Sequence, residues 1–160
     1  MFVDADGDGV DVNGNVVMTG GTLIVNGPTS NGNGALDYDG GFKMTSGYLI
    51  AVGSSGMAQA PDSSSTQYSV LVNMGTGVQA GTVIHLETSS GEELFSFTAT
   101  KWCQSLVFSS PELVKGTSYV LYLGGSSSGE SVDGLILNGE YTPGSKYTSF
   151  TISSMITRVA

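Results

Sequence analysis

Short stretches of alternating apolar and polar residues, separated by Gly, Asn, Asp and Ser, follow one another along this chain of 160 residues. No stretch shows the 3.6-residue apolar period of an amphipathic helix, and a two-residue alternation between turn residues is typical of half-buried strands. We therefore expect an all-β fold. After residue 66 the pattern predicts strands at 68–73, 82–87, 93–98, 105–108, 118–123, 147–153 and 156–159.

An internal repeat occupies the first third of the chain. Residues 11–27 align without gaps on residues 37–53, eight of the 17 positions are identical, and the offset is 26 residues. A period of this length, with short β-branched segments between Gly, Asn and Asp turns, is typical of one coil of a parallel β-solenoid. The alternative is a pair of ordinary hairpins that resemble each other. The expected apolar ladders are Val16/Phe42, Met18/Met44, Leu23/Leu49 and Val25/Ala51.

The repeat predicts a division of the chain into three parts. Residues 1–56 are expected to form a short parallel β-helix of about two coils, residues 57–66 a linker or loop, and residues 67–160 an antiparallel, sandwich-like capping unit. Glycines at equivalent positions of the two coils are expected at corners that require positive φ, namely Gly21, Gly47, Gly27 and Gly53. Because solenoids normally need three or more repeats, the first coil is expected to be completed by upstream coils or by another chain.

The charge balance excludes several classes of partner. The chain has 14 acidic and 5 basic residues, with a net charge of −9, so it cannot form the basic surface that nucleic acid requires. No apolar run is long enough to insert into a membrane. Low Lys content and abundant Gly, Ser, Thr and Asn favour an extracellular or cell-surface protein. The single cysteine, Cys103, excludes an internal disulfide and is expected to be a small buried residue.

Acidic residues gather without a base in the first 42 residues, and these residues are Asp4, Asp6, Asp8, Asp11, Asp37 and Asp39. Stacked coils would place Asn13 over Asp39 and Asp11 over Asp37, and the two like charges of the Asp11–Asp37 pair would destabilise a sheet. A bound Ca²⁺ would relieve the repulsion, since carboxylates and carbonyl oxygens are its preferred ligands. Residues 4–9 match the first half of an EF-hand loop, but Asn15 stands where that loop needs Glu. The alternative is that these Asp and Asn residues only form turns.

The same region resembles a known family. The resemblance is carried by DGDGVDVNGN at 6–15, MTGGT at 18–22, VNGP at 25–28, NGNGALDYDG at 31–40 and GSSGMAQ at 53–59, and it continues to YTSFT near the end. These segments are similar to bacterial cell-surface carbohydrate-binding β-helix proteins, whose characterised type binds acidic plant polysaccharide such as polygalacturonate. The chain resembles only the C-terminal part of that family, whose members carry more coils upstream.

The resemblance implies a right-handed, pectate-lyase-like parallel β-helix with Ca²⁺ in its turns. It implies Ca²⁺ binding by residues at the matching positions, which are Asp6, Asp8, Asp11, Asn13, Asp37 and Asp39. With Asp4 from the acidic run, these residues form the predicted metal-ligand set. Acidic polysaccharide is the implied partner, with the bound Ca²⁺ bridging it to this acidic chain.

Three classes of function remain open at this point. The first is calcium-dependent, non-catalytic polysaccharide binding, in which Tyr38, Tyr48 or Trp102 could stack on sugar rings, although packing is the commoner role of such residues. The second is a polysaccharide lyase, which is disfavoured because the only base in the coils, Lys43, is expected opposite Val17 rather than an acid. No catalytic residues are therefore predicted. The third is a structural subunit that assembles end to end through the open edge of its N-terminal coil.

Overall fold

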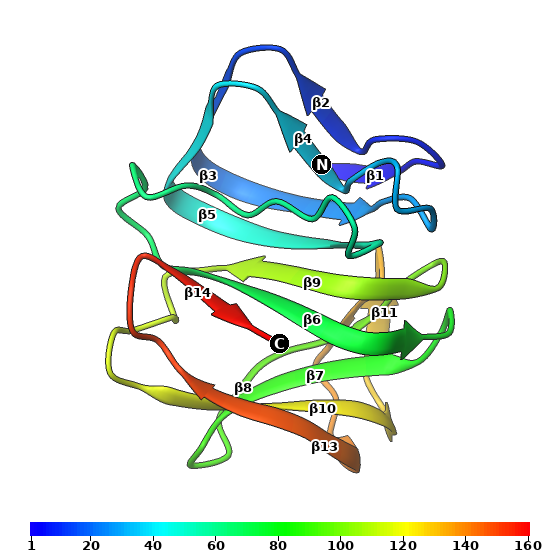
Figure 1. The fold of residues 1–160 in the computed structure, drawn as a ribbon. Coiled ribbons are helices and arrows are strands. Elements are labelled where there is room, and N and C mark those ends of the chain that lie inside the picture. Colours follow the sequence, from blue (N-terminus) through cyan, green and yellow to red (C-terminus); the bar gives the residue numbers. More distant parts are fainter.

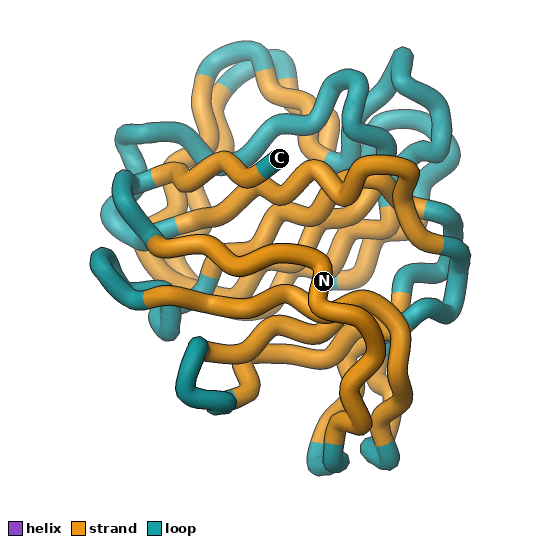
Figure 2. The backbone as a smooth tube through the Cα atoms, turned by 60° about the horizontal axis from the view of Figure 1, so that its bottom comes forward, coloured by secondary structure: helices purple, strands orange, loops and turns teal.

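The computed structural model describes residues 1–160, and all of its regular structure is β (Figure 2), as the sequence predicts. The 14 strands are β1 (Phe2–Asp4), β2 (Val10–Val12), β3 (Asn15–Asn26), β4 (Leu36–Tyr38), β5 (Gly41–Gly53), β6 (Ser69–Val78), β7 (Val83–Thr88), β8 (Glu93–Thr98), β9 (Cys103–Ser109), β10 (Ser118–Ser127), β11 (Glu130–Val132), β12 (Leu135–Leu137), β13 (Tyr141–Thr151) and β14 (Ile156–Val159). No helix has the length and apolar character needed to cross a bilayer.

The strands form two six-stranded sheets and one two-stranded ladder (Figure 1). Sheet 1 has the strand order β1-β3-β5-β9-β6-β14, and sheet 2 has the order β11-β12-β8-β7-β10-β13. In sheet 1, β1, β3 and β5 are parallel, β9 is antiparallel to both of its neighbours, and β14 is parallel to β6. Sheet 2 is antiparallel throughout. The parallel pair β2–β4, called the outer ladder below, lies on the side of sheet 1 away from sheet 2.

Two apolar cores lie on opposite faces of sheet 1. The larger one, with 19 buried residues, fills the space between the two sheets, and Ile24, Ile50 and Phe108 contribute to it. The smaller one, with 11 buried residues, lies under the outer ladder and includes Val25 and Ala51. Strands that are buried on both faces read as continuous apolar runs rather than as alternating ones. This explains the uninterrupted burial at the ends of β3 and β5.

Cys103 belongs to the larger core and is 1 % exposed, as predicted. Burial raises the pKa of its thiol to about 12. The thiolate form is therefore not populated near neutral pH, and the side chain is inert.

The predicted pairing of the two repeats is confirmed. β3 and β5 are parallel, with Val16 opposite Phe42, Met18 opposite Met44, Leu23 opposite Leu49 and Val25 opposite Ala51. Gly21 and Gly47 have φ values of 77° and 103°, as their corner positions require. Gly27 and Gly53 do not have positive φ, so the prediction was wrong for this pair. At Gly27 close packing excludes a side chain, because a Cβ would lie 2.7 Å from Cα of Ala35.

The expected fold class, a short right-handed parallel β-helix of about two coils followed by an antiparallel, sandwich-like capping unit, was wrong. The sheets are mixed and antiparallel, because β9 pairs antiparallel with β5 and ends the parallel stack after two repeats. The short strands of the outer ladder stack on nothing further. A repeat specifies only how its copies pair with one another, and the residues that cover the last copy lie more than 50 positions away, where no repeat marks them.

Residues 57–66, predicted to be a linker or a loop over the last coil, run along the edge of β4 and the first half of β5. Asp62 N donates to Phe42 O at 2.8 Å, and the Asp62 carboxylate accepts from Phe42 N at 2.8 Å. Ser65 Oγ accepts from Met44 N at 2.9 Å. These bonds satisfy backbone groups that would otherwise lie at an open edge. Sheet 1 itself joins strands from residues 1–56 and from residues 67–160.

Candidate functional site

Lys101, in the turn between β8 and β9, forms ion pairs with two of the predicted calcium ligands, Asp4 and Asp6. Its ammonium lies 2.7 Å from Asp4 Oδ1 and 3.6 Å from Asp6 Oδ1, and it donates to Ala5 O at 2.6 Å. The hydrogen bonds from Lys101 and Thr100 hold the pKa of Asp4 below its usual range. A cation at Asp4 would therefore have to displace the lysine that already neutralises it.

The outer ladder brings four other predicted ligands together, and we call Asp8, Asp11, Asp37 and Asp39 the acidic edge. Asp11 and Asp37 are paired in parallel register, as predicted. Asp8 Oδ1 accepts from Gly34 N at 2.8 Å, and the Asp8 carboxylate lies within hydrogen-bonding reach of Asp37. Partial loss of hydration, and then the charges of Asp8 and Asp11, raise the pKa of Asp37. The acidic edge is therefore a place where negative charge is not balanced.

The oxygens at the acidic edge fit a calcium ion only in part. No three His, Cys, Asp or Glu side chains are grouped so that they could hold a metal ion as they stand. The pair that fits best is Asp8 with Asp37, because their carboxylates already approach each other. Ca²⁺ takes about six to eight oxygens, including backbone carbonyls and water, in flexible geometry. Asp11 lies beside this pair, while Asn13 and Asp39 are exposed just beyond the paired strands.

Two of the three aromatic residues predicted to stack on sugars are engaged in packing. The Tyr38 hydroxyl donates to Ala60 O at 2.5 Å, and its ring meets the Phe42 ring edge-on with centroids 6.0 Å apart. Trp102 is half-buried against Gly77, where an added Cβ would lie 2.7 Å from the indole ring. These side chains lie on different elements and do not form one platform.

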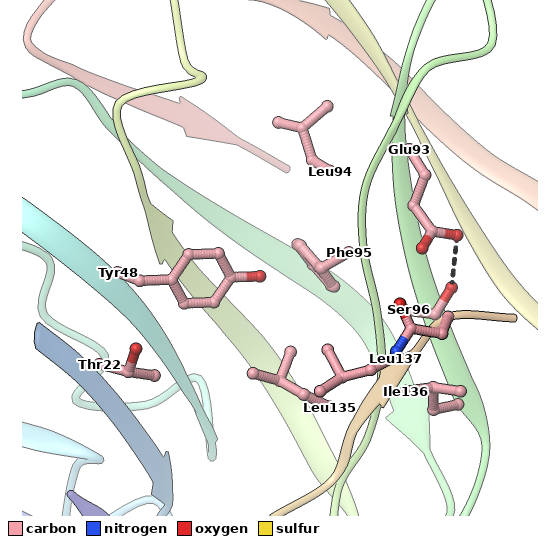
Figure 3. Close-up of a pocket in the computed structure, with 10 residues that line it drawn as sticks. Thr22, Tyr48, Glu93, Leu94, Phe95, Ser96, Leu135, Ile136 and Leu137 are labelled. Carbon is pink, nitrogen blue, oxygen red and sulfur yellow. Dashed lines mark hydrogen bonds between the residues drawn. The ribbon is translucent and has the colours of Figure 1, made fainter. Parts of the chain in front are cut away.

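Tyr48, the third predicted aromatic residue, lines a hollow between the two sheets, which we call the inter-sheet hollow (Figure 3). Its volume is about 300 Å³. The Tyr48 ring packs edge-on against Phe108 at 5.4 Å, and its hydroxyl points across the hollow toward β8. Burial raises the pKa of Tyr48, so the hydroxyl stays protonated and can donate a hydrogen bond. The lining residues are Thr22, Tyr48, Glu93, Leu94, Phe95, Ser96, Leu135, Ile136, Leu137 and Asn138.

Sequence reasoning missed a polar network on the other face of sheet 2. The alternation of His85 with the apolar Ile84 and Leu86 predicts an outward-pointing surface histidine, but His85 is 1 % exposed. The Tyr141 ring covers it, stacked at 3.8 Å and 9°. Its Nε2 lies 3.0 Å from Glu87 Oε2, and its Nδ1 lies 2.7 Å from Ser96 Oγ and 3.3 Å from Glu93 Oε2. The alternation placed His85 on the correct face, but nothing nearby in sequence marks Tyr141 as its cover.

The Ser96–His85–Glu87 contacts resemble the order of groups in a nucleophilic triad, but their surroundings do not support that chemistry. Ser96 is 1 % exposed, and its hydroxyl donates to Glu93 Oε2 at 3.1 Å. A nucleophile must reach a substrate carbonyl, with hydrogen-bond donors for the developing oxyanion beside it. The network therefore holds β7, β8 and β13 together and fixes the position of Glu93.

No family model, curated protein or solved structure matches this chain. The resemblance to cell-surface β-helix proteins therefore stays a prediction.

Proposed function

We propose that this chain is a non-catalytic module that binds Ca²⁺ at the acidic edge and, through that ion, acidic polysaccharide of the polyuronate type at the bacterial cell surface. The observation that supports the proposal is the approach of Asp8 to Asp37 beside the paired Asp11. Like charges in this arrangement favour uptake of a cation. Because the chain carries a net charge of −9, a polyuronate needs such a bridging dication to approach it.

A thermal melt in excess Ca²⁺ and in excess chelator tests the ion site. Binding to the folded chain alone stabilises it by about 2.7 kcal/mol at a hundredfold excess over the dissociation constant, and the midpoint rises accordingly. Asp37→Asn should abolish the calcium-dependent rise. Asp133→Asn is the matched control, because Asp133 lies in the two-residue turn between β11 and β12 at φ 53°, a conformation that Asn also adopts. An unchanged midpoint in wild type would contradict the proposal.

Sedimentation with insoluble polygalacturonate tests the sugar partner. We expect the wild-type chain to sediment with the polymer in Ca²⁺, to be released by chelator, and not to sediment with uncharged dextran. Asp37→Asn should stay in solution under all of these conditions. A chain that shows the calcium-dependent melt but never sediments with polyuronate would retain the ion site and refute the polysaccharide partner.

The non-catalytic part of the proposal is supported by the positions of the bases. β-Elimination from a uronate needs a base beside the metal-bound sugar. Lys43 is paired with Val17 in β3, as predicted, and Lys101 is engaged by Asp4. We therefore expect no unsaturated product when the chain is incubated with polygalacturonate and Ca²⁺, and accumulation of that product would refute this part.

A second candidate function is self-assembly through the free edge of sheet 1. β1 pairs only with the last three residues of β3, Ile24–Asn26, so β3 has a partner on one side alone over the rest of its length. Met1 and Val17, which are 83 % and 61 % exposed, border a hollow of about 370 Å³ at this edge. Analytical ultracentrifugation at two concentrations tests it: assembly that Val17→Lys abolishes would support this function, and a monomer at both concentrations would exclude it.

A further inference from the structure

Asn-Gly dipeptides are the places where a polypeptide most readily loses ammonia, because the glycine has no side chain to hinder the reaction. The backbone nitrogen of the glycine attacks the side-chain carbonyl carbon of the asparagine, ammonia leaves, and a succinimide ring closes. Water then opens the ring to aspartate or isoaspartate. The chain has five such dipeptides, which begin at Asn13, Asn26, Asn31, Asn33 and Asn138.

Hydrogen bonds of the glycine nitrogen protect two of these sites. Gly27 N donates to a carbonyl of β5 at 2.8 Å, and Asn26 before it is 1 % exposed. Gly34 N donates to Asp8 Oδ1 at 2.8 Å. A nitrogen held in this way must break its hydrogen bond before it can lose its proton and attack. Asn26 and Asn33 are therefore expected to react only when the chain opens locally.

Two other sites are restrained by packing or by a side-chain contact. Asn31 Oδ1 accepts from Gly56 N at 3.1 Å, which holds the carbonyl that would be attacked. Gly139, which follows Asn138 after β12, is packed against Gly129.

Asn13 has none of these restraints. It lies with Gly14 in the bend between β2 and β3, and both residues are exposed. Gly14 N and the Asn13 side chain make no hydrogen bond within the chain, and a Cβ built at Gly14 would meet nothing within 4 Å. The bend therefore leaves the attacking nitrogen and the reacting carbonyl free to meet.

Deamidation of Asn13 would add a carboxylate to the acidic edge. In the repeat, this position corresponds to Asp39, so the second copy already carries an aspartate before a glycine there. The two bends lie side by side, because Gly40 N donates to Gly14 O at 2.8 Å. The affinity of a site for Ca²⁺ rises with the number of its charged ligands.

We propose that Asn13 is a site of spontaneous deamidation and that the carboxylate formed there strengthens calcium binding at the acidic edge. The step replaces the amide nitrogen of the side chain by an oxygen from water, releases one ammonia and makes the net charge of −9 more negative by one unit. It needs no oxidant or reductant. The effect on calcium rests on the proposed function, whereas the modification itself does not.

Peptide mapping by mass spectrometry after incubation at mildly alkaline pH tests the modification, with the folded chain and the chain in guanidinium chloride compared site by site. We expect all five dipeptides to react in the denaturant. In the folded chain Asn13 should react at a similar rate, and the other four more slowly than in the denaturant. Asn13→Gln should remove the reaction at this position alone, because the longer side chain closes a ring far less readily. Protection of Asn13 in the folded chain equal to that of Asn26 would overturn the proposal.

Isothermal titration with CaCl₂ tests the effect on the acidic edge. Asn13→Asp is the aspartate product, and at low ionic strength it should bind Ca²⁺ about five- to tenfold more tightly than the unmodified chain, the effect of one further charge a few ångströms from a divalent ion. Asn138→Asp is the matched control, because it makes the same charge change on sheet 2 and should bind Ca²⁺ like wild type. Equal affinities of Asn13→Asp and wild type would refute the role of the new carboxylate. Absence of calcium binding in all three chains would refute the calcium function and this effect together, while the peptide mapping would still decide the modification.

Discussion

Phe108 lies where the repeat region meets the remainder of the chain, and its replacement tests that junction. On β9 it pairs with Ile50 of β5 on one side and with Val70 of β6 on the other. It is 0 % exposed, and its ring centroid lies 5.4 Å from that of Tyr48 and 4.8 Å from that of Phe95. Phe108→Leu keeps an apolar residue there but removes both aromatic contacts.

The magnitude follows from these contacts. Two aromatic pairs contribute about 0.5–1.5 kcal/mol each beyond their buried area. The smaller side chain also leaves unfilled space, and truncation of a core Phe to Ala sets an upper range of about 3–5 kcal/mol. We therefore expect Phe108→Leu to lower the free energy of unfolding by about 2–4 kcal/mol. For a chain of this size that corresponds to a midpoint lower by about 5–15 °C.

Urea and thermal unfolding followed by two probes provide the assay. The single tryptophan, Trp102, reports from the turn before β9, and far-UV circular dichroism reports on all strands. Because sheet 1 contains strands from both parts of the chain, we expect the two probes to shift together in one transition. Phe2→Leu is the matched control, since Phe2 is 40 % exposed on the short edge strand β1, and it should change stability by less than about 0.5 kcal/mol.

Two results would refute this reasoning. A change below about 1 kcal/mol in Phe108→Leu would mean that its aromatic contacts do not join the sheets as described. Two separate transitions, of which only one responds to the substitution, would mean that residues 1–56 and 67–160 unfold as independent units.

Three further predictions concern the charged groups. The pKa of Asp37 is raised in the folded chain, so its ionisation opposes folding as the pH rises above the unfolded-state pKa of about 4. Asp37→Asn, measured in chelator, should therefore raise the urea midpoint at pH 7 but not near pH 3. The pKa of Asp4 is lowered in the folded chain, so its carboxylate stabilises the fold above the unfolded pKa, and this effect is lost as the pH falls through the folded pKa. Asp4→Asn should therefore lower the urea midpoint at pH 7 and not near pH 2. Equal effects at the two pH values would contradict the assignment. His85→Phe keeps a ring against Tyr141 but leaves Glu87 and Glu93 without their shared partner. It should lower the free energy of unfolding, measured in urea, by about 1–3 kcal/mol. An unchanged free energy of unfolding would contradict a stabilising role for the His85 network.

Local patterns predicted the strands and the pairing of the repeats because both depend on nearby residues. The alternation placed strands at 93–98 and 156–159 with the bounds that β8 and β14 have. Identity between the repeats fixed the register of Asp11 on Asp37, because a shift by one residue would move the apolar side chains to the wrong face.

The fold beyond the repeats depended on pairings that no local pattern marks. β9 reads as an ordinary half-buried strand, yet it enters sheet 1 between β5 and β6 and so replaces a third coil. The short strands β11 and β12 were not predicted, although the Asp133–Gly134 pair between them, with φ of 53° and 91°, is a typical two-residue hairpin turn. That dipeptide was the available signal.

The candidate sites show the same division between local and distant information. The acidic edge follows from the repeat, since Asp11 and Asp37 occupy equivalent positions. The neutralisation of Asp4 by Lys101 joins residues 97 positions apart in the chain. The inter-sheet hollow draws its lining from β3, β5, β8 and β12, so only the assembled sheets create it.

The position of β9 between β5 and β6 has a consequence for how the chain folds. Ile50 of β5 can pair only after Phe108 of β9 has been synthesised. Val70 of β6 likewise gains its partner in β14 only after Thr157 has been synthesised. Pairings over such long sequence distances carry a large loop-closure entropy and make folding slow. During synthesis the apolar edge of β5 stays open until β9 has left the ribosome, and in that interval it can pair with another nascent chain. Early collapse of residues 57–66 onto the first half of β5 would shorten the exposed part of that edge.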